Sequence, residues 1–323
     1  MDVLSEVLRA VRLTGAVFFD IHAAAPWAVA SPRTDEIRTR VMPTSDHLMS
    51  FHLVMDGEGW IEANELGEIP RRIERGDVIL MPRGDSHYLS SAPGVRVPAR
   101  MEDFYRPQDR QLPFRVSVDG NGPGIHIVCG YFGCDAAPFN PLLDVLPRLT
   151  VIKAGPDCGK LAATFINAAL TEGGAERPGG ETILAKLSEL MLVQAIRMHI
   201  EALPAESGGW LGGLRDPLVG RVLGQIHADP ARDWSLVSLA RAAGLSRSVM
   251  AERFTRLVGL PPMTYLARWR MQLAAHALER PGAAIANVAA DVGYQSEAAF
   301  NRAFKKIVGS PPGLWRRSRQ DAA

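Results

Sequence analysis

The chain has 323 residues, more than one hydrophobic core usually serves, which predicts two domains. Hydrophobic residues make up 47% and charged residues 22%, which excludes a disordered chain. The net charge of +1 conceals an asymmetry, because residues 214–323 contain 16 Lys and Arg against 8 Asp and Glu, and the rest contains 20 against 27. A basic segment favours a polyanionic partner, with a chance surface bias as the alternative.

Three features exclude other classes of protein. No apolar run reaches the roughly 18 residues that a membrane span needs, so no membrane partner is expected. The start, Met1–Glu6, lacks the basic and apolar regions of a signal peptide. The cysteines, Cys129, Cys134 and Cys158, are too few and odd in number for a disulfide framework, so the reducing cytoplasm is the expected location.

Residues 1–130 have the pattern of a β-rich domain. Short apolar stretches alternate with Gly, Pro and Asp turns, as at Ser50–Val54, Gly57–Glu62 and Asp77–Met81. Many short strands separated by turns predict a sandwich or a barrel.

From Pro141 the pattern becomes helical. Helical spacing covers Lys160–Leu170 and Glu181–Leu203, and the second segment has an apolar stripe with the polar Gln194 within it: Leu184, Leu187, Met191 and Met198. This stripe either packs against its own domain or forms the seam of a homodimer, and periodicity does not choose between the two. The segment that follows contains Pro204 and four glycines, which predicts a linker at residues 204–213.

The C-terminal part of the sequence repeats itself. The pattern Leu239-Ala240-x-x-Ala243-Gly244 recurs 49 residues later as Val288-Ala289-x-x-Val292-Gly293. Five further residues recur at an offset of 50: Ser246, Phe254, Gly259, Pro261 and Pro262 match Ser296, Phe304, Gly309, Pro311 and Pro312. The extra residue falls in the turn after Gly293, where a loop can absorb it.

Each copy predicts a helix-turn-helix motif. A first helix, at about Ser235–Ala243 and Ala284–Val292, is followed by a glycine that can adopt the positive φ of a tight turn. The second helix, at Ser246–Val258 and Ser296–Val308, begins at a serine that can cap it. Between the copies, Thr264–Leu278 contains no Gly or Pro and predicts a rigid connecting helix.

Two such motifs suit double-stranded DNA. The second helix of a helix-turn-helix fits the major groove and presents base-reading side chains. Two copies on one rigid helix could enter successive major grooves about 34 Å apart. Two matched motifs and the basic charge disfavour a repeat used for protein contacts, whereas an architectural protein that binds DNA without sensing anything stays an alternative.

These residues resemble the AraC/XylS family of transcription regulators. The resemblance covers about Asp233–Arg317 and includes Arg270-Met271-x-x-Ala274, the run from Ile285 to Tyr294, and the run from Phe300 to Arg316. In that family, exposed residues near the start of each recognition helix contact bases. The resemblance therefore implies these DNA-binding residues: Ser246, Arg247, Ser248, Ala251, Glu252 and Arg253 in the first motif, and Gln295, Ser296, Glu297, Ala298, Asn301, Arg302, Lys305 and Lys306 in the second.

The two recognition helices differ in charge. Lys305 and Lys306 in the second are expected to touch phosphate, which positions the protein without specifying sequence. Glu252 in the first departs from the family, in which a basic residue is common. Its carboxylate could accept from cytosine N4, or it could be a solvated partner of Arg253 or Arg256.

A weaker resemblance, over about Phe18–Tyr131, is to cupins. Gly76-x5-Pro82-x-Gly84-x2-His87 resembles their second motif, and Val54-x-x-Gly57-x-Gly59 resembles the end of their first. The resemblance implies a cupin-type sensor domain that binds a small-molecule effector. Metal-binding cupins use two His and a Glu in the first motif, but here the Glu position falls near Ser50 and the paired His are absent.

Other side chains could replace those ligands. On period-2 counting His52 shares a face with Ser50 and could point inward. We expect His52, His87 and His126 to bind the effector, and His52, His87 and Cys129 are candidate ligands for a divalent metal such as zinc. The alternative is hydrogen-bonded core histidines and a buried thiol, with no cofactor required. A cupin metalloenzyme fused to a DNA-binding domain is the competing function, which the loss of the usual ligands disfavours.

Together these patterns predict a two-domain fold. Residues 1–203 form an all-β cupin-like barrel with appended α-helices at about 141–203, residues 204–213 form a linker, and residues 214–319 form an all-α domain of two helix-turn-helix motifs. We expect a dimeric, cytoplasmic transcription regulator, an activator and not an enzyme. Its expected partners are double-stranded DNA, a small-molecule effector, a second copy of the chain and RNA polymerase.

Overall fold

The computed structural model divides the chain into two compact units, each discontinuous in sequence. The sheet unit comprises residues 13–134 and 146–201, and the helical unit comprises residues 1–12, 135–145 and 202–323. The structure describes residues 2–63, 67, 69–99, 101, 112–154, 164–165, 168, 171, 178–204 and 208–320. Cys158 and most of the helix expected at Lys160–Leu170 lie outside these residues.

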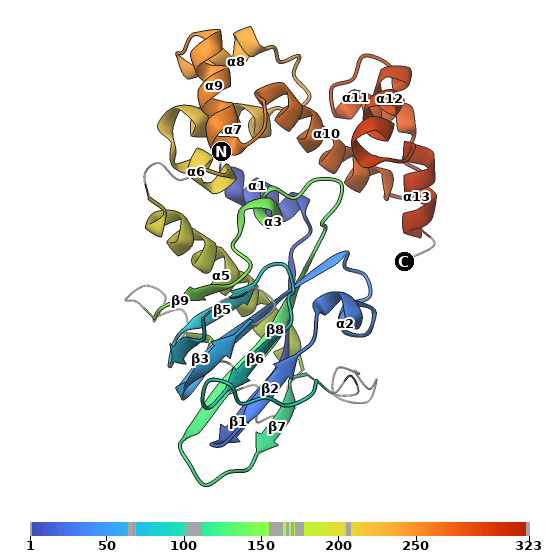
Figure 1. The fold of residues 1–323 in the computed structure, drawn as a ribbon. Helices are drawn as coiled ribbons and strands as arrows, with labels where there is room; N and C mark the ends of the chain where they lie inside the picture. The colour runs from blue at the N-terminus through green and yellow to red at the C-terminus, as the bar shows by residue number, and fades with distance from the viewer. Residues whose placement is uncertain are drawn as a thin grey trace. The chain divides into compact units, whose positions relative to one another are not determined.

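The sheet unit is built on one curled, nine-stranded sheet (Figure 1). Its strands are β1 (Thr14–Ala24), β2 (Ala28–Ser31), β3 (His47–Glu62), β4 (Arg71–Glu74), β5 (Val78–Met81), β6 (His87–Ser90), β7 (Phe114–Val118), β8 (Gly124–Cys134) and β9 (Thr150–Ile152). The order is β2-β6-β3-β8-β1-β7, with β4 and β5 also on β3 and β9 on β5. The long strand β3 pairs with β8 and β5 along its first part and with β4 and β6 along its last, which makes the sheet a half-barrel.

A bend in β3 allows this change of partners. The register against β8 shifts between Val54 and Asp56, as at a β-bulge. Gly57 follows with φ of 79°, and a Cβ there would lie 2.3 Å from the carbonyl oxygen of Gly124. Only glycine fits so close an approach of two strands at that φ.

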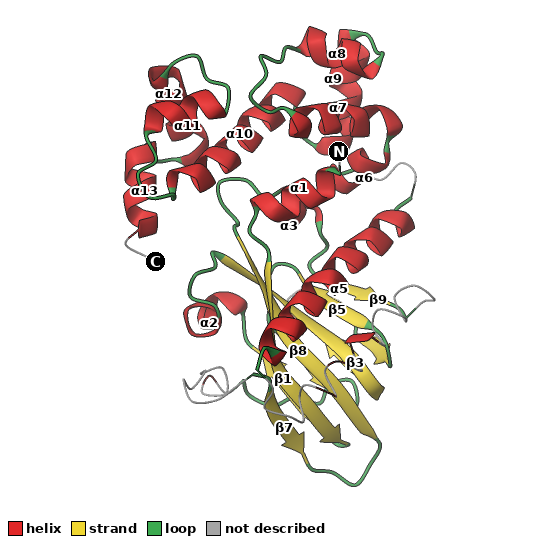
Figure 2. Cartoon of the chain, turned by 180° about the vertical axis from the view of Figure 1, so that it is seen from behind, coloured by secondary structure: helices red, strands yellow, loops and turns green. Residues whose placement is uncertain are grey.

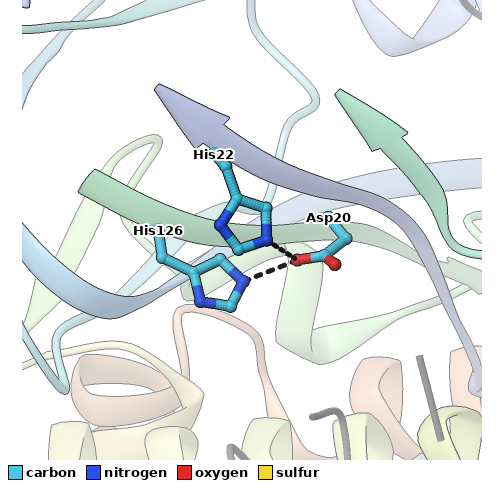
Figure 3. Close-up of side chains that lie close together, drawn as sticks. All are labelled: Asp20, His22 and His126. Atoms are coloured by element: carbon cyan, nitrogen blue, oxygen red, sulfur yellow. Dashed lines mark hydrogen bonds and ion pairs between the residues drawn. The ribbon is translucent and has the colours of Figure 1, made fainter. Parts of the chain in front are cut away.

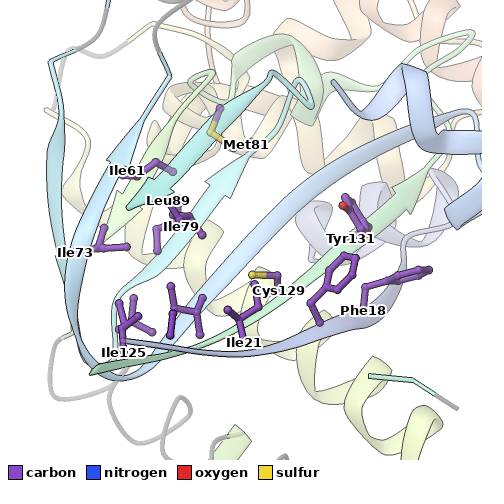
Figure 4. Close-up of a cluster of buried hydrophobic side chains, with 14 of the residues drawn as sticks. Phe18, Ile21, Ile61, Ile73, Ile79, Met81, Leu89, Ile125, Cys129 and Tyr131 are labelled. Carbon is purple, nitrogen blue, oxygen red and sulfur yellow. The ribbon is translucent and has the colours of Figure 1, made fainter. Parts of the chain in front are cut away.

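The concave face of the sheet encloses an apolar core, as predicted for a β-rich domain. Figure 4 shows side chains from several strands meeting there, among them Ile21, Ile79, Ile125 and Cys129. These residues alternate with outward-facing ones along each strand, the pattern that a half-buried sheet requires. Helix α2 (Thr34–Val41) adds the fully buried Ile37 to this core.

Helix α5 (Gly180–Ala202) crosses the sheet (Figure 2). A Cβ on Gly15 of β1 would lie 2.4 Å from Ser188 Oγ, so the helix and the strand approach closely. Leu184 and Met191 are buried in this packing. The stripe predicted on this segment therefore packs against its own unit through these two residues.

The helical unit combines three separate stretches of sequence. Its helices are α1 (Val3–Ala10), α3 (Pro141–Val145), α6 (Trp210–Arg215), α7 (Pro217–Ala228), α8 (Leu236–Ala243), α9 (Arg247–Val258), α10 (Pro262–Leu278), α11 (Ile285–Asp291), α12 (Glu297–Val308) and α13 (Pro312–Gln320). Helix α6 overlaps the linker expected at residues 204–213, and Trp210 within it is 1% exposed. The end of that segment is thus packed helix, because Trp210 and Leu211 bury against the unit. The contact units also cut across the expected domain boundaries, which remain a prediction about independent folding.

The C-terminal helices begin and end close to their predicted limits. Ser235, Ser246 and Ser296 cap α8, α9 and α12 with their side chains, as the sequence indicated for the two recognition helices. The turn glycines Gly244 and Gly293 have φ of 71° and 84°. Among the helices in the described part of the chain, none combines the length and hydrophobicity needed to span a membrane.

Candidate DNA-binding surface and histidine clusters

The first recognition helix, α9, presents most of its predicted contact residues to solvent. Arg247, Ser248 and Glu252 are exposed, as is the capping Ser246, and Ala251 is partly buried. The helix holds this orientation because Met250, Phe254 and Leu257 are buried on its other side.

Arg253, another of the predicted contacts, forms an ion pair within the chain. Its guanidinium donates to Asp216, with Nε 3.0 Å and Nη2 2.5 Å from Oδ2. Asp216 also caps α7 by accepting from the amides of Leu218 and Val219 at 3.0 and 2.9 Å. Burial acts to raise the pKa of Asp216, but Arg253 and these amides hold it below its usual value. Arg253 is therefore paired with Asp216 and not with Glu252. The sequence had offered Arg253 as one of two possible partners of the Glu252 carboxylate.

The second recognition helix, α12, exposes a more basic surface. Arg302, Lys305 and Lys306 are exposed, as are four residues at its N-terminal end: Gln295, Ser296, Glu297 and Ala298. Asn301 is partly buried, and its Oδ1 has no hydrogen-bond partner among the described residues. Phe300 and Phe304 are fully buried beneath this surface.

Arg270 on α10 fixes the two motifs to each other. Its guanidinium donates to the carbonyl oxygens of Pro230 at 2.7 Å, Arg232 at 2.9 Å and Gly293 at 3.3 Å. The first two lie in the loop before α8, and Gly293 is the turn glycine of the second motif. One side chain thus holds both motifs, which supports the rigid connection expected from the sequence.

The contacts predicted from the sequence leave out two exposed residues of α9. Val249 is 48% exposed and Arg256 is exposed. The signal was available, because helical spacing from the apolar Met250 and Phe254 places residues 249, 252 and 256 on the opposite side. An exposed valine in a recognition helix offers the apolar contact that a thymine methyl group accepts.

On the concave face of the sheet, the structure brings His52 and His87 together. Their Nε2 atoms are 2.7 Å apart, and His87 Nδ1 is 2.9 Å from the carbonyl oxygen of Asp85. Since that carbonyl can only accept, His87 carries its proton on Nδ1 and His52 donates from Nε2. Burial lowers the pKa of His87 to about 4 and that of His52 well below its ordinary value, so both rings are neutral near pH 7.

Two polar atoms beside this pair lack partners. His52 Nδ1, which this tautomer leaves as an acceptor, and Ser50 Oγ are buried with no hydrogen-bond partner among the described residues. Leaving such groups unpaired costs about 1–3 kcal/mol each. A ligand that donates to His52 and Ser50 would recover that free energy.

Cys129 lies opposite His52 in the register of β3 and β8. Burial raises the pKa of its thiol, which lies in the apolar core (Figure 4). The ligand atoms of His52, His87 and Cys129 do not form a group of three within 4.8 Å. A metal bound by these residues remains a prediction.

His126 does not join His52 and His87. Ile125 and Ile127 of β8 are in the concave core, so His126 between them points to the other face of the sheet. There its Nε2 lies 2.5 Å from Asp20 Oδ1 (Figure 3). Asp20 and His22, two residues apart on β1, were not singled out from the sequence, although their alternation in a β-pattern was a usable signal.

Comparisons with known proteins support a cupin domain followed by a helix-turn-helix domain. A cupin family model matches residues 2–201, and a helix-turn-helix domain model matches residues 239–318. A protein of Streptomyces lividans named as an AraC-like transcription regulator is 34% identical, with 98% of each chain covered. One of the same name from Streptomyces antibioticus is 32% identical, over 98% of this chain and 99% of its own. The HTH-type transcriptional regulator MtrA of Neisseria gonorrhoeae is 26% identical, with 98% of each chain covered.

Proposed function

This chain belongs to the AraC-like transcription regulators, which bind double-stranded DNA, and we propose that it recognises a bipartite DNA site under the control of a small-molecule effector bound in the sheet unit. Its relatives are regulators by name, so the chain is a regulator and not a cupin metalloenzyme. The observation that carries the proposal is the pair of exposed recognition helices that Arg270 fixes to each other.

Arg302 is the base-reading candidate that tests this proposal. A double-stranded site is first selected from random sequence with the full-length protein. Arg302→Ala should then weaken binding to that site by about 1–3 kcal/mol and relax specificity at one position. Arg280→Ala is the control, because Arg280 is exposed but lies outside both recognition helices. Unchanged affinity for Arg302→Ala would remove that residue from the interface.

Lys305 and Lys306 are proposed to contact phosphate. Replacing either with Ala should weaken binding similarly on all sequences and reduce the salt slope of binding by about 1. If the protein binds every DNA sequence equally, it is an architectural DNA-binding protein and not a site-specific regulator.

The unpartnered atoms on the concave face support an effector site there. The effector would donate hydrogen bonds to His52 and Ser50, both buried, beside the neutral His87. A screen of small molecules against the full-length protein, read as a shift in melting temperature, identifies candidates. Ser50→Ala should abolish the shift given by a true effector, whereas Ser91→Ala, a substitution away from these groups, should retain it.

The chain itself offers a route from this site to the DNA-binding helices. Strand β1 begins two residues after Arg12, and β8 ends just before Asp135. Within the helical unit, Arg12 donates to Asp135 at 2.7 and 2.8 Å and to Glu279, at the end of α10, at 2.5 Å. Buried Gln272 of α10 donates to the carbonyl of Ala10 and accepts from the amide of Phe139. We infer that effector binding acts on α10 through these two segments.

A homodimer through α5 is the second part of this proposal. Ile183 and Leu190 are 44% and 55% exposed and lie seven residues apart on one face of the helix. Exposed apolar side chains at this spacing suit a helix–helix seam. Ile183→Lys with Leu190→Lys should convert a dimer to a monomer in analytical ultracentrifugation, and a monomeric parent chain would contradict the proposal. Activation through RNA polymerase stays a prediction.

A further inference from the structure

Three ligand-type side chains meet on the face of the sheet opposite the apolar core. Asp20 and His22 lie two residues apart on β1, and His126 lies directly opposite His22 on β8. Ile21 and Ile125, their neighbours in sequence, belong to the concave core. Because side chains alternate along a strand, the three polar groups share the other face (Figure 3).

The geometry of this cluster is that of a prepared ligand set. Asp20 Oδ1 lies 2.5 Å from His126 Nε2 and 3.4 Å from His22 Nε2, and the two imidazole rings stack with centroids 3.9 Å apart. All three ligand atoms lie within 4.8 Å of one another, which holds for one such group among the described residues. The side chains of Asp20 and His126 are 13% exposed and that of His22 is 52% exposed. The side chains of Asp20 and His126 are therefore largely buried, and that of His22 is exposed to solvent.

We propose that Asp20, His22 and His126 bind a divalent transition-metal ion of the zinc class. Two imidazole nitrogens and one carboxylate oxygen suit such ions, whereas Mg²⁺ and Ca²⁺ prefer six or more oxygen ligands. Ligand atoms about a tetrahedral zinc lie roughly 3.3 Å apart, so small rotations of these side chains suffice. The exposed side at His22 leaves room for a water molecule as the fourth ligand. This site goes beyond the proposed function and is separate from the His52–His87 pair, which lies on the concave face.

The electrostatics of the cluster favour a charged carboxylate. Burial acts to raise the pKa of Asp20, but the hydrogen bond and charge of His126, followed by those of His22, lower it overall. Arg115 Nε lies 3.7 Å from Oδ2, the other oxygen of Asp20. Its positive charge opposes a bound cation, so binding depends on the two imidazoles.

The test uses Co²⁺ as a spectroscopic probe on the tag-free, full-length protein after chelator treatment. We expect one equivalent of Co²⁺ to bind with the visible absorption of a low-symmetry site, and Zn²⁺ to displace it. His22→Gln and Asp20→Asn should each weaken binding at least tenfold. His22 is half exposed, so its replacement leaves the core intact, and His199→Gln on α5 is the control that should bind as the parent does.

Three outcomes would overturn the proposal. They are the absence of stoichiometric Co²⁺ binding, equal binding by the parent and the His22→Gln/His126→Gln variant, or loss of binding only in His52→Gln. The last result would assign the ion to the concave face. DNA binding by the metal-free variants is measured in parallel, so a failed metal site is distinguished from a failed regulator assignment.

Discussion

The two helix-turn-helix motifs share a local design but differ in what surrounds them. The first motif, α8 and α9, lies beside α6 and α7 in the part of the unit that also receives residues 1–12 and 135–145. The second, α11 and α12, closes a smaller core with α10 and α13, centred on Phe300 and Phe304. Segments far apart in the sequence thus meet at α6, α7 and α10, beside the first motif.

The exposed surfaces of the two recognition helices also differ, and here the second motif has the additional feature, which is positive charge. Six residues after its capping serine, the first recognition helix has Glu252 and the second has Arg302, and both are exposed. Arg253 of the first is held by Asp216, whereas the second adds the exposed Lys305 and Lys306. Under the proposed function, the second motif would supply more of the affinity for DNA and the first would receive the regulatory signal.

The turn glycines should show the largest difference between the motifs. Gly244 and Gly293 both have positive φ, but a Cβ on Gly244 meets nothing within 4 Å, whereas one on Gly293 would lie 2.2 Å from the carbonyl oxygen of Ala231. Gly244→Ala should therefore cost about 1 kcal/mol in the free energy of unfolding, from backbone strain alone. Gly293→Ala should cost about 3 kcal/mol, because a backbone must also move.

Urea unfolding of the two variants measures this difference. Gly282→Ala is a further control, since Gly282 has φ of 74° and open space around it. Equal losses at Gly244 and Gly293 would mean that the loop before α8 yields freely, and the two motifs would then not be fixed to each other.

Acidification should destabilise the helices around the first motif more than those around the second. His227 on α7 is buried, its Nε2 lies 2.8 Å from the hydroxyl of Tyr265, and burial lowers its pKa to about 3. In the unfolded chain the pKa is about 6.5, so between these values the unfolded state binds the extra proton. Stability present above pH 6.5 is then lost as the pH falls, by up to about 1.4 kcal/mol per unit.

His227→Gln is the matched variant, because its amide oxygen can still accept from Tyr265 but does not titrate. The difference between the unfolding free energies at pH 7 and pH 5 should shrink in this variant. No histidine follows His276, so the protection of backbone amides from hydrogen exchange should change less with pH in α11 and α12 than in α7. If the free energy of unfolding depends on pH in His227→Gln as it does in the parent, His227 is not the group responsible for that dependence.

The sequence predicted local structure well where one repeat explained the other. Ser246 and Ser296 as caps, and Gly244 and Gly293 as turns, follow from residue type and spacing alone. The hydrogen bonds of Gln272 to Phe139 and Ala10 and the burial of Trp210 could not be predicted from the sequence, because both depend on contacts with segments distant in the chain. The placement of His126 on the opposite face of the sheet from His52 did not follow for a related reason, since the face that each side chain occupies depends on the register and bulge of the pairing between β3 and β8.

Glu252→Arg tests whether charge alone distinguishes the recognition helices. The substitution gives the first helix the residue that the second has at the equivalent position. We expect tighter binding to non-specific DNA by about 1 kcal/mol and a salt slope larger by one to two, because a repulsive charge is replaced by an attractive one. Gel-shift titrations over a range of salt measure both quantities. Weaker binding to the selected site would instead indicate that Glu252 accepts from a cytosine.

The smallest expected difference lies in how the first helix of each motif begins. Ser235 caps α8 by accepting from the amide of Ser238 at 3.1 Å, and Ser238 Oγ accepts from the Ser235 amide in return. Ala284 holds the equivalent position before α11 and makes no side-chain cap. Ala284→Ser should therefore stabilise the protein by about 0.5–1 kcal/mol, and Ser235→Ala should destabilise it by a similar amount. Because Ala284 is exposed, the gain requires no repacking, and urea unfolding of the two variants would give shifts of opposite sign. A neutral Ala284→Ser would mean that the start of α11 is held by packing against α10 and α12, and the two motifs would then differ in what holds their first helices as well as in charge.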